Sequence, residues 1–169
     1  MIALDSPFEG VARLLPCLPP AMLKGINPLL TLELLKLLMG MGHDDSVVLA
    51  DANFTAMSIA AGKPVLRLPG RGMVQAVQAV NSLLPLAADV VHPVCFMQVS
   101  STHSPYLSEL QPAVLESLAP DLLPGQSAKP QERFAFYDRA RTAYAVILTG
   151  ERQPFGNFIL RKGIIGESL

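Results

Sequence analysis

The sequence predicts a single α/β domain whose central, mostly parallel sheet is flanked by helices on both faces. Short apolar runs rich in β-branched residues alternate with segments in which apolar residues recur at helical spacing, a pattern typical of strand–helix–strand units. The run at residues 46–52 is mostly apolar without strict alternation, which indicates a strand buried on both faces, as in parallel sheets. A chain of 169 residues is long enough to enclose one such core.

The first half of the chain carries clear signals for individual elements. Its pattern predicts, in order, a helix over residues 32–41, strands over 46–52 and 64–70, a helix over 73–86 and a strand over 91–99. Thr31 is the expected N-cap of the first helix, because its hydroxyl can accept a hydrogen bond from an unpaired N–H of the first turn. Gly42 is the expected stop of the same helix.

The second half of the chain is less regular. Its pattern predicts a helix over residues 104–120 broken near Pro112, a loop over 124–131, a short charged helix over 136–143, and strands over 143–150 and 155–163. A turn containing Gly150 and Pro154 is expected to join the last two strands. Ligands of such folds bind where parallel strands end, and Asp51 lies at the end of its predicted strand.

Composition and charge exclude several classes of function. The formal net charge is −1 and no basic cluster occurs, which argues against a nucleic-acid partner. Pro, Gly and charged residues break the apolar runs before they reach the length of about 20 residues that spans a membrane, so no membrane partner is expected. Cys17 and Cys95 lack the spacing of paired ligands. We therefore expect no zinc site, no disulfide framework and a cytoplasmic location.

The first 21 residues differ from the rest of the chain. They contain several prolines and no clear period, and patterned sequence begins at Met22. Asp5 and Glu9 stand where a secretory signal would be basic. We expect residues 1–21 to be a poorly ordered extension or the product of a mis-assigned start, and residues 22–169 to form the domain.

The segment from His43 to Asp51 holds the first candidate chemistry. An imidazole has an unperturbed pKa of about 6.5, so His43 could transfer protons at neutral pH beside Asp51 as a polar anchor. Spacing alone fits equally well a loop histidine after a helix and an aspartate that caps a turn. The surrounding GMGHDD lacks the final glycine of a dinucleotide fingerprint and follows a helix, not a strand. Adjacent residues such as its His-Asp-Asp rarely converge on one metal ion, so no metal site is expected.

Two later segments offer further polar side chains. ERFAFYDRAR, residues 132–141, contains Arg133 and Tyr137, which could reach sugar or carboxylate oxygens but also suit a solvated helix face. TGERQPFGNF, residues 149–158, contains Asn157, which can donate and accept at once, yet its Gly, Pro and Asn suit a simple connection between strands. No nucleophile elbow, P-loop or paired-carboxylate pattern occurs in the sequence.

Two long motifs resemble the ribose pyranase/fucose mutarotase family, and its fucose mutarotase branch in particular. They are MLKGINPLLTLELLKLLMGMGHDDSVVLADANF, from residue 22, and ERFAFYDRARTAYAVILTGERQPFGNFILRKG, which ends at residue 163. The resemblance implies an α/β fold, ring-shaped homo-oligomers such as decamers with active sites where subunits meet, and exchange of monosaccharide anomers without cofactor or metal. A fucose-like sugar is the implied substrate.

The resemblance also implies roles for individual residues. His43 falls on the family's proton donor, and the sugar-binding positions fall on Asp51, Arg133, Phe155, Gly156 and Asn157, with Tyr137 in the same motif as Arg133. In the resulting hypothesis, protonated His43 donates to the ring oxygen while Tyr137, or a water that it holds, accepts from the anomeric hydroxyl. Asp51 is expected on the same rim as His43, where it would help to keep the imidazole charged.

Departures from the family pattern leave alternatives open. Phe155 replaces the family's tyrosine, and Ala87 stands where an aspartate is common. These changes bear on the identity of the sugar more than on the fold. The alternatives are pyranose–furanose exchange on ribose, a non-catalytic monosaccharide-binding protein, and a structural subunit whose polar motifs serve only assembly.

Overall fold

The computed structural model describes residues 23–100 and 106–166 of the chain. The predicted N-terminal extension therefore lies outside the described residues, and so does the beginning of the helix predicted over residues 104–120. In the described ranges, no helix is long and apolar enough to cross a membrane.

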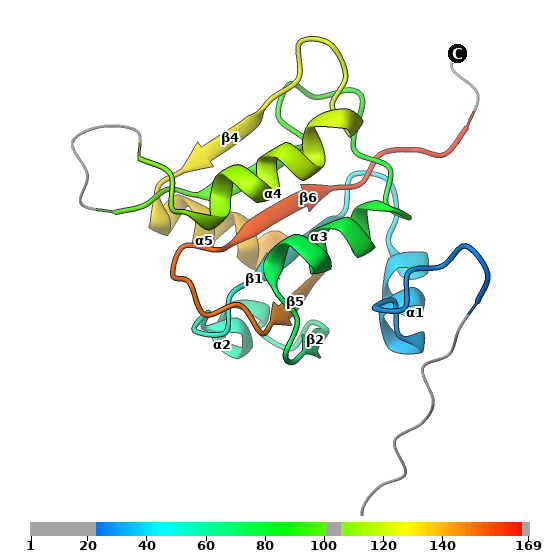
Figure 1. The fold of residues 1–169 in the computed structure, drawn as a ribbon, viewed down its shortest axis with the longest axis horizontal. Helices are drawn as coiled ribbons and strands as arrows, with labels where there is room; N and C mark the ends of the chain where they lie inside the picture. The colour runs from blue at the N-terminus through cyan, green and yellow to red at the C-terminus, as the bar shows by residue number, and fades with distance from the viewer. Residues whose placement is uncertain (1–22, 101–105, 167–169) are drawn as a thin grey trace, which may run out of the picture.

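The described strands form one six-stranded sheet in the order β2-β5-β1-β6-β3-β4 (Figure 1). They are β1 (Ser46–Ala50), β2 (Val65–Leu68), β3 (Val94–Met97), β4 (Ala128–Gln131), β5 (Ala145–Thr149) and β6 (Phe158–Arg161). The pairs β1–β5, β2–β5 and β3–β4 are parallel. Only β6 runs the other way, antiparallel to both β1 and β3. The prediction of a mostly parallel central sheet is confirmed.

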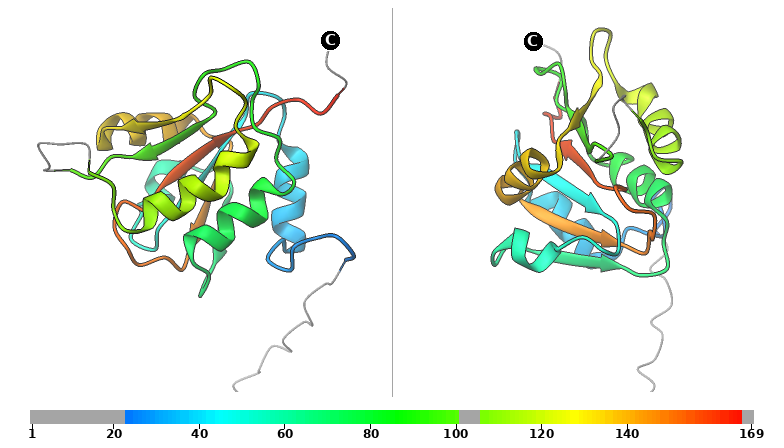
Figure 2. Two further views of the ribbon diagram at one scale, coloured as in Figure 1. Left: turned by 45° about the horizontal axis from the view of Figure 1, so that its top comes forward. Right: turned by 90° about the vertical axis from the view of Figure 1, so that its left-hand side faces the viewer.

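Helices cover both faces of this sheet, as predicted (Figure 2). The first face packs against α1 (Leu32–Gly40), α3 (Met73–Asn81) and α4 (Leu110–Leu118), which continues into the short 3₁₀ turn η1 (Ala119–Asp121). The second face packs against α2 (Ala56–Ala60) and α5 (Arg133–Thr142).

Strand β1 lies between two hydrophobic clusters, one on each face of the sheet. Val47 and Leu49 belong to the cluster under α1, α3 and α4, whereas Val48 and Ala50 belong to the cluster under α2 and α5. All four are fully buried. Successive side chains of a strand point to opposite faces, so a continuous apolar run is the pattern that such a strand requires.

The helix signals in the first half of the chain are largely confirmed. Thr31 caps α1, and its hydroxyl accepts a hydrogen bond from the Leu34 N–H at 3.3 Å. The helix ends at Gly40, before the predicted stop. Helix α2 was not predicted, because five residues are too short to display a helical period.

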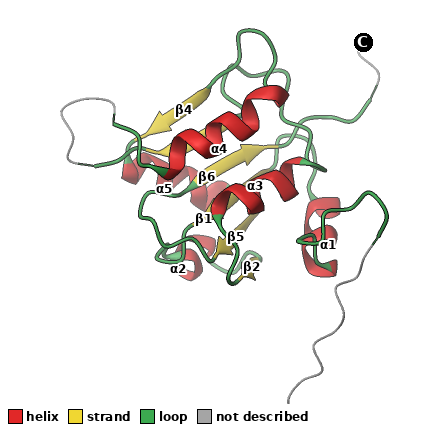
Figure 3. Cartoon of the chain, viewed as in Figure 1, coloured by secondary structure: helices red, strands yellow, loops and turns green. Residues whose placement is uncertain are grey.

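Two predictions around proline are wrong. Figure 3 shows α4 as one continuous helix and β4 as a strand. Pro112 does not break α4 but lies in its first turn, where a proline is tolerated because those N–H groups have no partner within the helix. The predicted loop over residues 124–131 contains β4 with Pro130 inside it. Strand β4 is at the edge of the sheet, and an edge strand can accommodate a residue without an N–H.

Two further features differ from the prediction near the C-terminus: the start of α5 and the connection between the last two strands. Helix α5 begins at Arg133, three residues before the predicted start, because the Glu132 carboxylate accepts hydrogen bonds from two N–H groups of the first turn. The last two strands follow one another in sequence but are not neighbours, since β1 lies between β5 and β6. Their connection therefore passes the end of β1 at one edge of the sheet and is not a hairpin.

We expect Gly150→Ala to lower the free energy of unfolding by about 2–3 kcal/mol, the usual effect of overpacking. Gly150 lies just after β5, where its N–H donates to the Arg71 carbonyl at 2.9 Å. A Cβ at this position would lie 2.6 Å from the Gly70 nitrogen and 2.9 Å from the Arg71 nitrogen. Both atoms are backbone, so neither can move aside cheaply. Urea unfolding at a fixed protomer concentration measures the change.

The matched control is Gly166→Ala. A Cβ at Gly166 would meet no atom within 4 Å, so we expect a change of no more than about 0.5 kcal/mol. Equal losses in the two variants would contradict the role assigned to the close approach at Gly150.

Candidate functional site

A pocket of about 250 Å³ opens at the edge of the sheet where β1, β3 and β5 end. Its lining residues come from the segment after β1, the last residue of β3, the first turns of α5 and the loop before β6: Asp51, Asn53, Phe54, Met97, Arg133, Tyr137, Pro154, Phe155 and Asn157. Because β6 is antiparallel to β1, its first residue lies at the edge where β1 ends. The antiparallel strand therefore delivers Asn157 to Asp51.

Asp51 and Asn157 form a reciprocal pair at the base of the pocket. The Asn157 Nδ2 donates to Asp51 Oδ2 at 2.8 Å, and the Asp51 backbone N–H donates to Asn157 Oδ1 at 3.0 Å. Each residue is only 3% exposed. The other carboxylate oxygen of Asp51 accepts from the Asn53 N–H at 2.9 Å. These bonds hold the carboxylate in one orientation.

Burial raises the pKa of the Asp51 carboxyl above its ordinary value. Loss of solvent is the largest cause, because it disfavours the charged form. Hydrogen bonds from the Asn53 backbone, the Asn157 side chain and the Gly156 backbone act in the opposite direction, and the nearby Glu151 charge adds to the increase. Asp51 therefore takes up a proton more readily than an exposed aspartate would.

Arg133 and Tyr137 form the second polar group of the pocket. They are one helical turn apart on α5, and the Arg133 Nε donates to the Tyr137 Oη at 3.2 Å. The guanidinium carbon lies 5.4 Å from the centroid of the Tyr137 ring. Phe54 packs edge-on against the same ring at 5.7 Å. The phenol is thus fixed by two neighbours, and its oxygen keeps a proton and a lone pair for a ligand.

His43 does not join these residues within one chain. It precedes the first residue of β1, whereas Asp51 follows the last. A strand of five residues carries the chain about 16 Å across the sheet, so the two side chains lie at opposite edges. The expectation that they share a rim is wrong for a single chain. His43 Nε2 instead lies 3.7 Å from the Asp89 carboxylate, in a half-exposed contact.

Sequence reasoning missed several residues of the site. Asn53 had a readable signal, because an aspartate that accepts from the N–H two residues later forms a common turn. Phe54, Met97 and Pro154 had none, since they are ordinary apolar residues until the fold brings them together. Among the described residues, no group of three or more His, Cys, Asp or Glu side chains is arranged to hold a metal ion.

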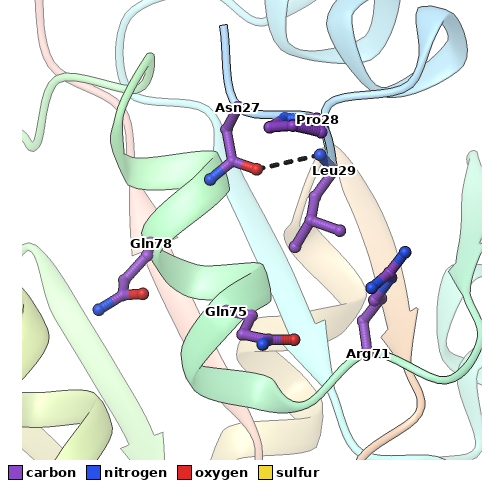
Figure 4. Close-up of a pocket in the computed structure, with 6 residues that line it drawn as sticks. All are labelled: Asn27, Pro28, Leu29, Arg71, Gln75 and Gln78. Carbon is purple, nitrogen blue, oxygen red and sulfur yellow. Dashed lines mark hydrogen bonds between the residues drawn. The ribbon is translucent and has the colours of Figure 1, made fainter. Parts of the chain in front are cut away.

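A second pocket, of about 310 Å³, lies between α3 and the loop before α1 (Figure 4). Its residues are Asn27, Pro28, Leu29, Arg71, Gln75 and Gln78, and Asn27 Oδ1 accepts from the Leu29 N–H at 3.0 Å. Amides do not titrate, and an arginine stays charged in proteins. This pocket therefore offers hydrogen bonds but no group for proton transfer at neutral pH.

The fold and the first pocket define a single-domain α/β protein with a small, polar binding site at the carboxyl edge of its sheet. Residues 24–165 match the model of the RbsD / FucU transport protein family. The chain is 41% identical over 147 residues to the L-fucose mutarotase of Actinobacillus pleuropneumoniae, with 85% of this chain and 97% of that protein covered. It is 42% identical over 145 residues to the human fucose mutarotase, with 85% and 94% covered.

A solved structure agrees with these matches. The fucose mutarotase of Streptococcus pneumoniae, in complex with L-fucose, superimposes with a TM-score of 0.77 at 32% identity, and the match covers 85% of this chain and all of that one. The chain belongs to the RbsD / FucU family.

Proposed function

We propose that the protein is a cofactor-independent mutarotase that interconverts the anomers of L-fucose or a closely related monosaccharide. The observation that carries this proposal is the convergence of the Asp51–Asn157 pair and the Arg133–Tyr137 pair on one pocket. The pocket is at the small end of ligand sites, which suits one monosaccharide. The relatives named L-fucose mutarotase and fucose mutarotase support the same reaction.

The reaction needs only proton transfer. Mutarotation opens a cyclic hemiacetal and recloses it on the other face of the carbonyl, so the ring oxygen gains a proton while the anomeric hydroxyl loses one. Closure reverses both transfers. General acid–base catalysis typically accelerates such a step by about 10²–10⁴-fold, which is sufficient for a reaction that also proceeds in water.

The pocket residues divide between proton transfer and binding. Tyr137 accepts the proton of the anomeric hydroxyl as it releases its own to solvent, or a water that it holds accepts that proton in its place. Asp51, Asn157 and Arg133 hold the sugar hydroxyls. The loop of Phe155 and Gly156 forms a wall, and the Phe155 ring offers an apolar surface to the carbon face of the sugar.

His43 of a neighbouring subunit would complete the site as the proton donor to the ring oxygen. One chain leaves His43 at the other edge of the sheet, half-exposed and beside Asp89. An assembly that docks this edge onto the pocket edge of the next copy would bring the imidazole to the sugar. We therefore propose a homo-oligomer, with the ring-shaped decamer as its expected form and active sites shared between subunits.

Two further proposals concern the chain as a whole. The family match starts at residue 24, which supports a domain that begins near Met22, with residues 1–21 as an extension. Cys95 is a free, buried thiol, which fits a cytoplasmic location with reduced cysteines.

Saturation-transfer NMR with catalytic amounts of protein tests the function. We expect accelerated exchange between the two anomeric signals of L-fucose, with weaker effects on D-galactose and D-ribose. Accelerated pyranose–furanose exchange on ribose would instead favour a ribose pyranase. Binding without exchange would identify a sugar-binding protein, and no binding to any of the three sugars would favour a structural subunit.

A further inference from the structure

A fully buried amide on α4 connects three distant segments behind the wall of the pocket. Gln111 is 0% exposed. Its Nε2 donates to the Met97 carbonyl at 2.7 Å and to the Phe155 carbonyl at 3.0 Å. Its Oε1 accepts from the Ser108 N–H at 3.0 Å. Both hydrogens of the NH₂ group are therefore used on segments that line the pocket, although Gln111 itself does not line it.

One of the bonded carbonyls belongs to a residue with an unusual backbone. Phe155 has φ of +63°, a left-handed conformation that is rare for a bulky side chain and persists only where neighbours hold it. Helix α4 also packs closely against Gly156, the next residue. A Cβ at Gly156 would lie only 2.8 Å from Leu110 Cδ2. The start of α4 thus determines the course of the loop that ends at Asn157.

The other bonded carbonyl belongs to a neighbour of Asn157. The Met97 N–H donates to the Asn157 carbonyl at 3.0 Å, and the Met97 sulfur lies 3.8 Å from Asn157 Nδ2. Gln111 therefore holds two residues that flank Asn157, one on β3 and one in the loop before β6. Asn157 in turn orients the Asp51 carboxylate.

We propose that Gln111 is a positioning residue for the sugar site. It fixes the left-handed Phe155 and the end of β3, so that Asn157 and the Phe155 ring stand where a monosaccharide needs them. This inference rests on the proposed function, since it assigns the pocket wall to sugar binding. Its consequence is that α4, which covers the opposite face of the sheet from α5, controls affinity without touching the sugar.

The chain contains a matched control for this role. Gln126 makes the same set of bonds as Gln111: its Nε2 donates to the Ala87 and Val90 carbonyls at 2.9 and 2.8 Å, and its Oε1 accepts from the N–H three residues earlier. It lies just before β4, which is parallel to β3, and so at the edge of the sheet away from the pocket of its own chain. Its bonded carbonyls flank Asp89, the partner of His43, so the two variants are compared by KM and by local hydrogen exchange and not by kcat. If Gln111 had only a structural role, its substitution should lower the melting temperature without changing KM, as we expect for Gln126.

Gln111→Met and Gln126→Met each remove three equivalent side-chain hydrogen bonds with little change in side-chain size. We expect both variants to melt at a lower temperature than the wild type. Only Gln111→Met should raise the KM for L-fucose, by about tenfold, the scale of a lost hydrogen-bond network. Its kcat should stay within about twofold of the wild type, because His43 and Tyr137 are untouched and only uniform binding is lost. An unchanged KM in folded Gln111→Met would overturn the proposal.

A milder variant covers the case in which Gln111→Met does not fold. Gln111→Glu keeps the oxygen that accepts from Ser108 and, protonated at this buried position, can still donate to one carbonyl. We expect its KM to lie between those of the wild type and Gln111→Met. A wild-type KM in this variant, with the Phe155 loop unaltered, would likewise count against the proposal.

Hydrogen exchange measured by mass spectrometry separates this inference from the proposed function. The peptide that contains residues 153–158 should exchange faster in Gln111→Met or Gln111→Glu and at the wild-type rate in Gln126→Met. Unchanged exchange in both Gln111 variants would overturn the positioning role even in an active enzyme. Wild-type protein that neither binds sugars nor accelerates anomer exchange would overturn the proposed function. The hydrogen-exchange rates of residues 153–158 would still test the positioning role of Gln111.

Discussion

His43→Ala and Tyr137→Phe are each expected to lose nearly all anomer exchange when pure, and to recover part of it when the two variants are co-expressed. General acid–base groups contribute about 10²–10⁴-fold to such reactions, so each pure variant should fall by a factor in this range. Neither change should disturb the core, because His43 is half-exposed and Tyr137→Phe keeps the ring that packs against the cluster under α2 and α5. Saturation-transfer NMR on L-fucose measures the rates.

The recovery follows from the geometry of one chain. His43 and Tyr137 lie at opposite edges of the same sheet, so a site that uses both must take them from two subunits. In an assembly of equal amounts of the two variants, about a quarter of such sites would carry both native residues. If each site instead used residues of one subunit, no site in the mixture would be complete. Absence of recovery in verified mixed assemblies would therefore refute the shared site.

His92→Ala is the matched control for the imidazole. His92 also lies at the edge of the sheet where β3 begins, and its Nδ1 is 3.2 Å from the Ser127 carbonyl and from the Ser127 hydroxyl. It has no place in the proposed site, so its variant should exchange anomers at the wild-type rate. Near-normal exchange in His43→Ala would remove His43 from the mechanism.

The parts of the fold that the sequence predicted are those encoded by local pattern. The apolar run of β1 indicated a strand buried on both faces, and Thr31 marked the start of α1 through a hydrogen bond three residues away. Strand β4 was not predicted, because its AKPQ sequence has neither alternation nor an apolar run. Its place depends on pairing with β3, which the local sequence does not record.

The candidate site was predictable only in part for the same reason. Family motifs named Asp51 and Asn157, but their contact depends on β6 entering antiparallel beside β1. The separation of His43 from Asp51 could have been foreseen, since a strand lies between them. Gln111 could not, because its partners at 97, 108 and 155 meet only in the folded chain.

Asp51→Asn is expected to lower kcat/KM for L-fucose by about 10- to 100-fold, the range for hydrogen bonds to a charged group. The carboxylate accepts from Asn157 Nδ2 on one oxygen and from the Asn53 N–H on the other. An amide at position 51 must turn its NH₂ toward one of these donors, which leaves two donors facing each other. Asp138→Asn is the control, because Asp138 is an exposed carboxylate on α5 that pairs with Arg141 and should matter little.

The same carboxyl is expected to make stability and function respond to pH in opposite directions. Burial raises the pKa of Asp51 above 3.8, so the folded state favours the proton. The resulting stability is full below the unfolded pKa and is lost as the pH rises through the folded pKa. The unfolding free energy of the wild type minus that of Asp51→Asn should therefore decrease from acid to neutral pH, in urea titrations at a fixed protomer concentration.

Sugar binding should follow the opposite course, because the ionised carboxylate is the form that can accept from Asn53, Asn157 and a sugar hydroxyl together. We expect affinity for L-fucose to fall as the pH drops through the raised pKa of Asp51, and this acid limb to vanish in Asp51→Asn. A stability difference that is flat or rises with pH would contradict the burial argument. If stability and affinity both depend on pH in these opposite directions, the protein keeps an ionised carboxylate in a place where its fold would prefer a neutral one. This is the behaviour of a binding group and not of a structural one.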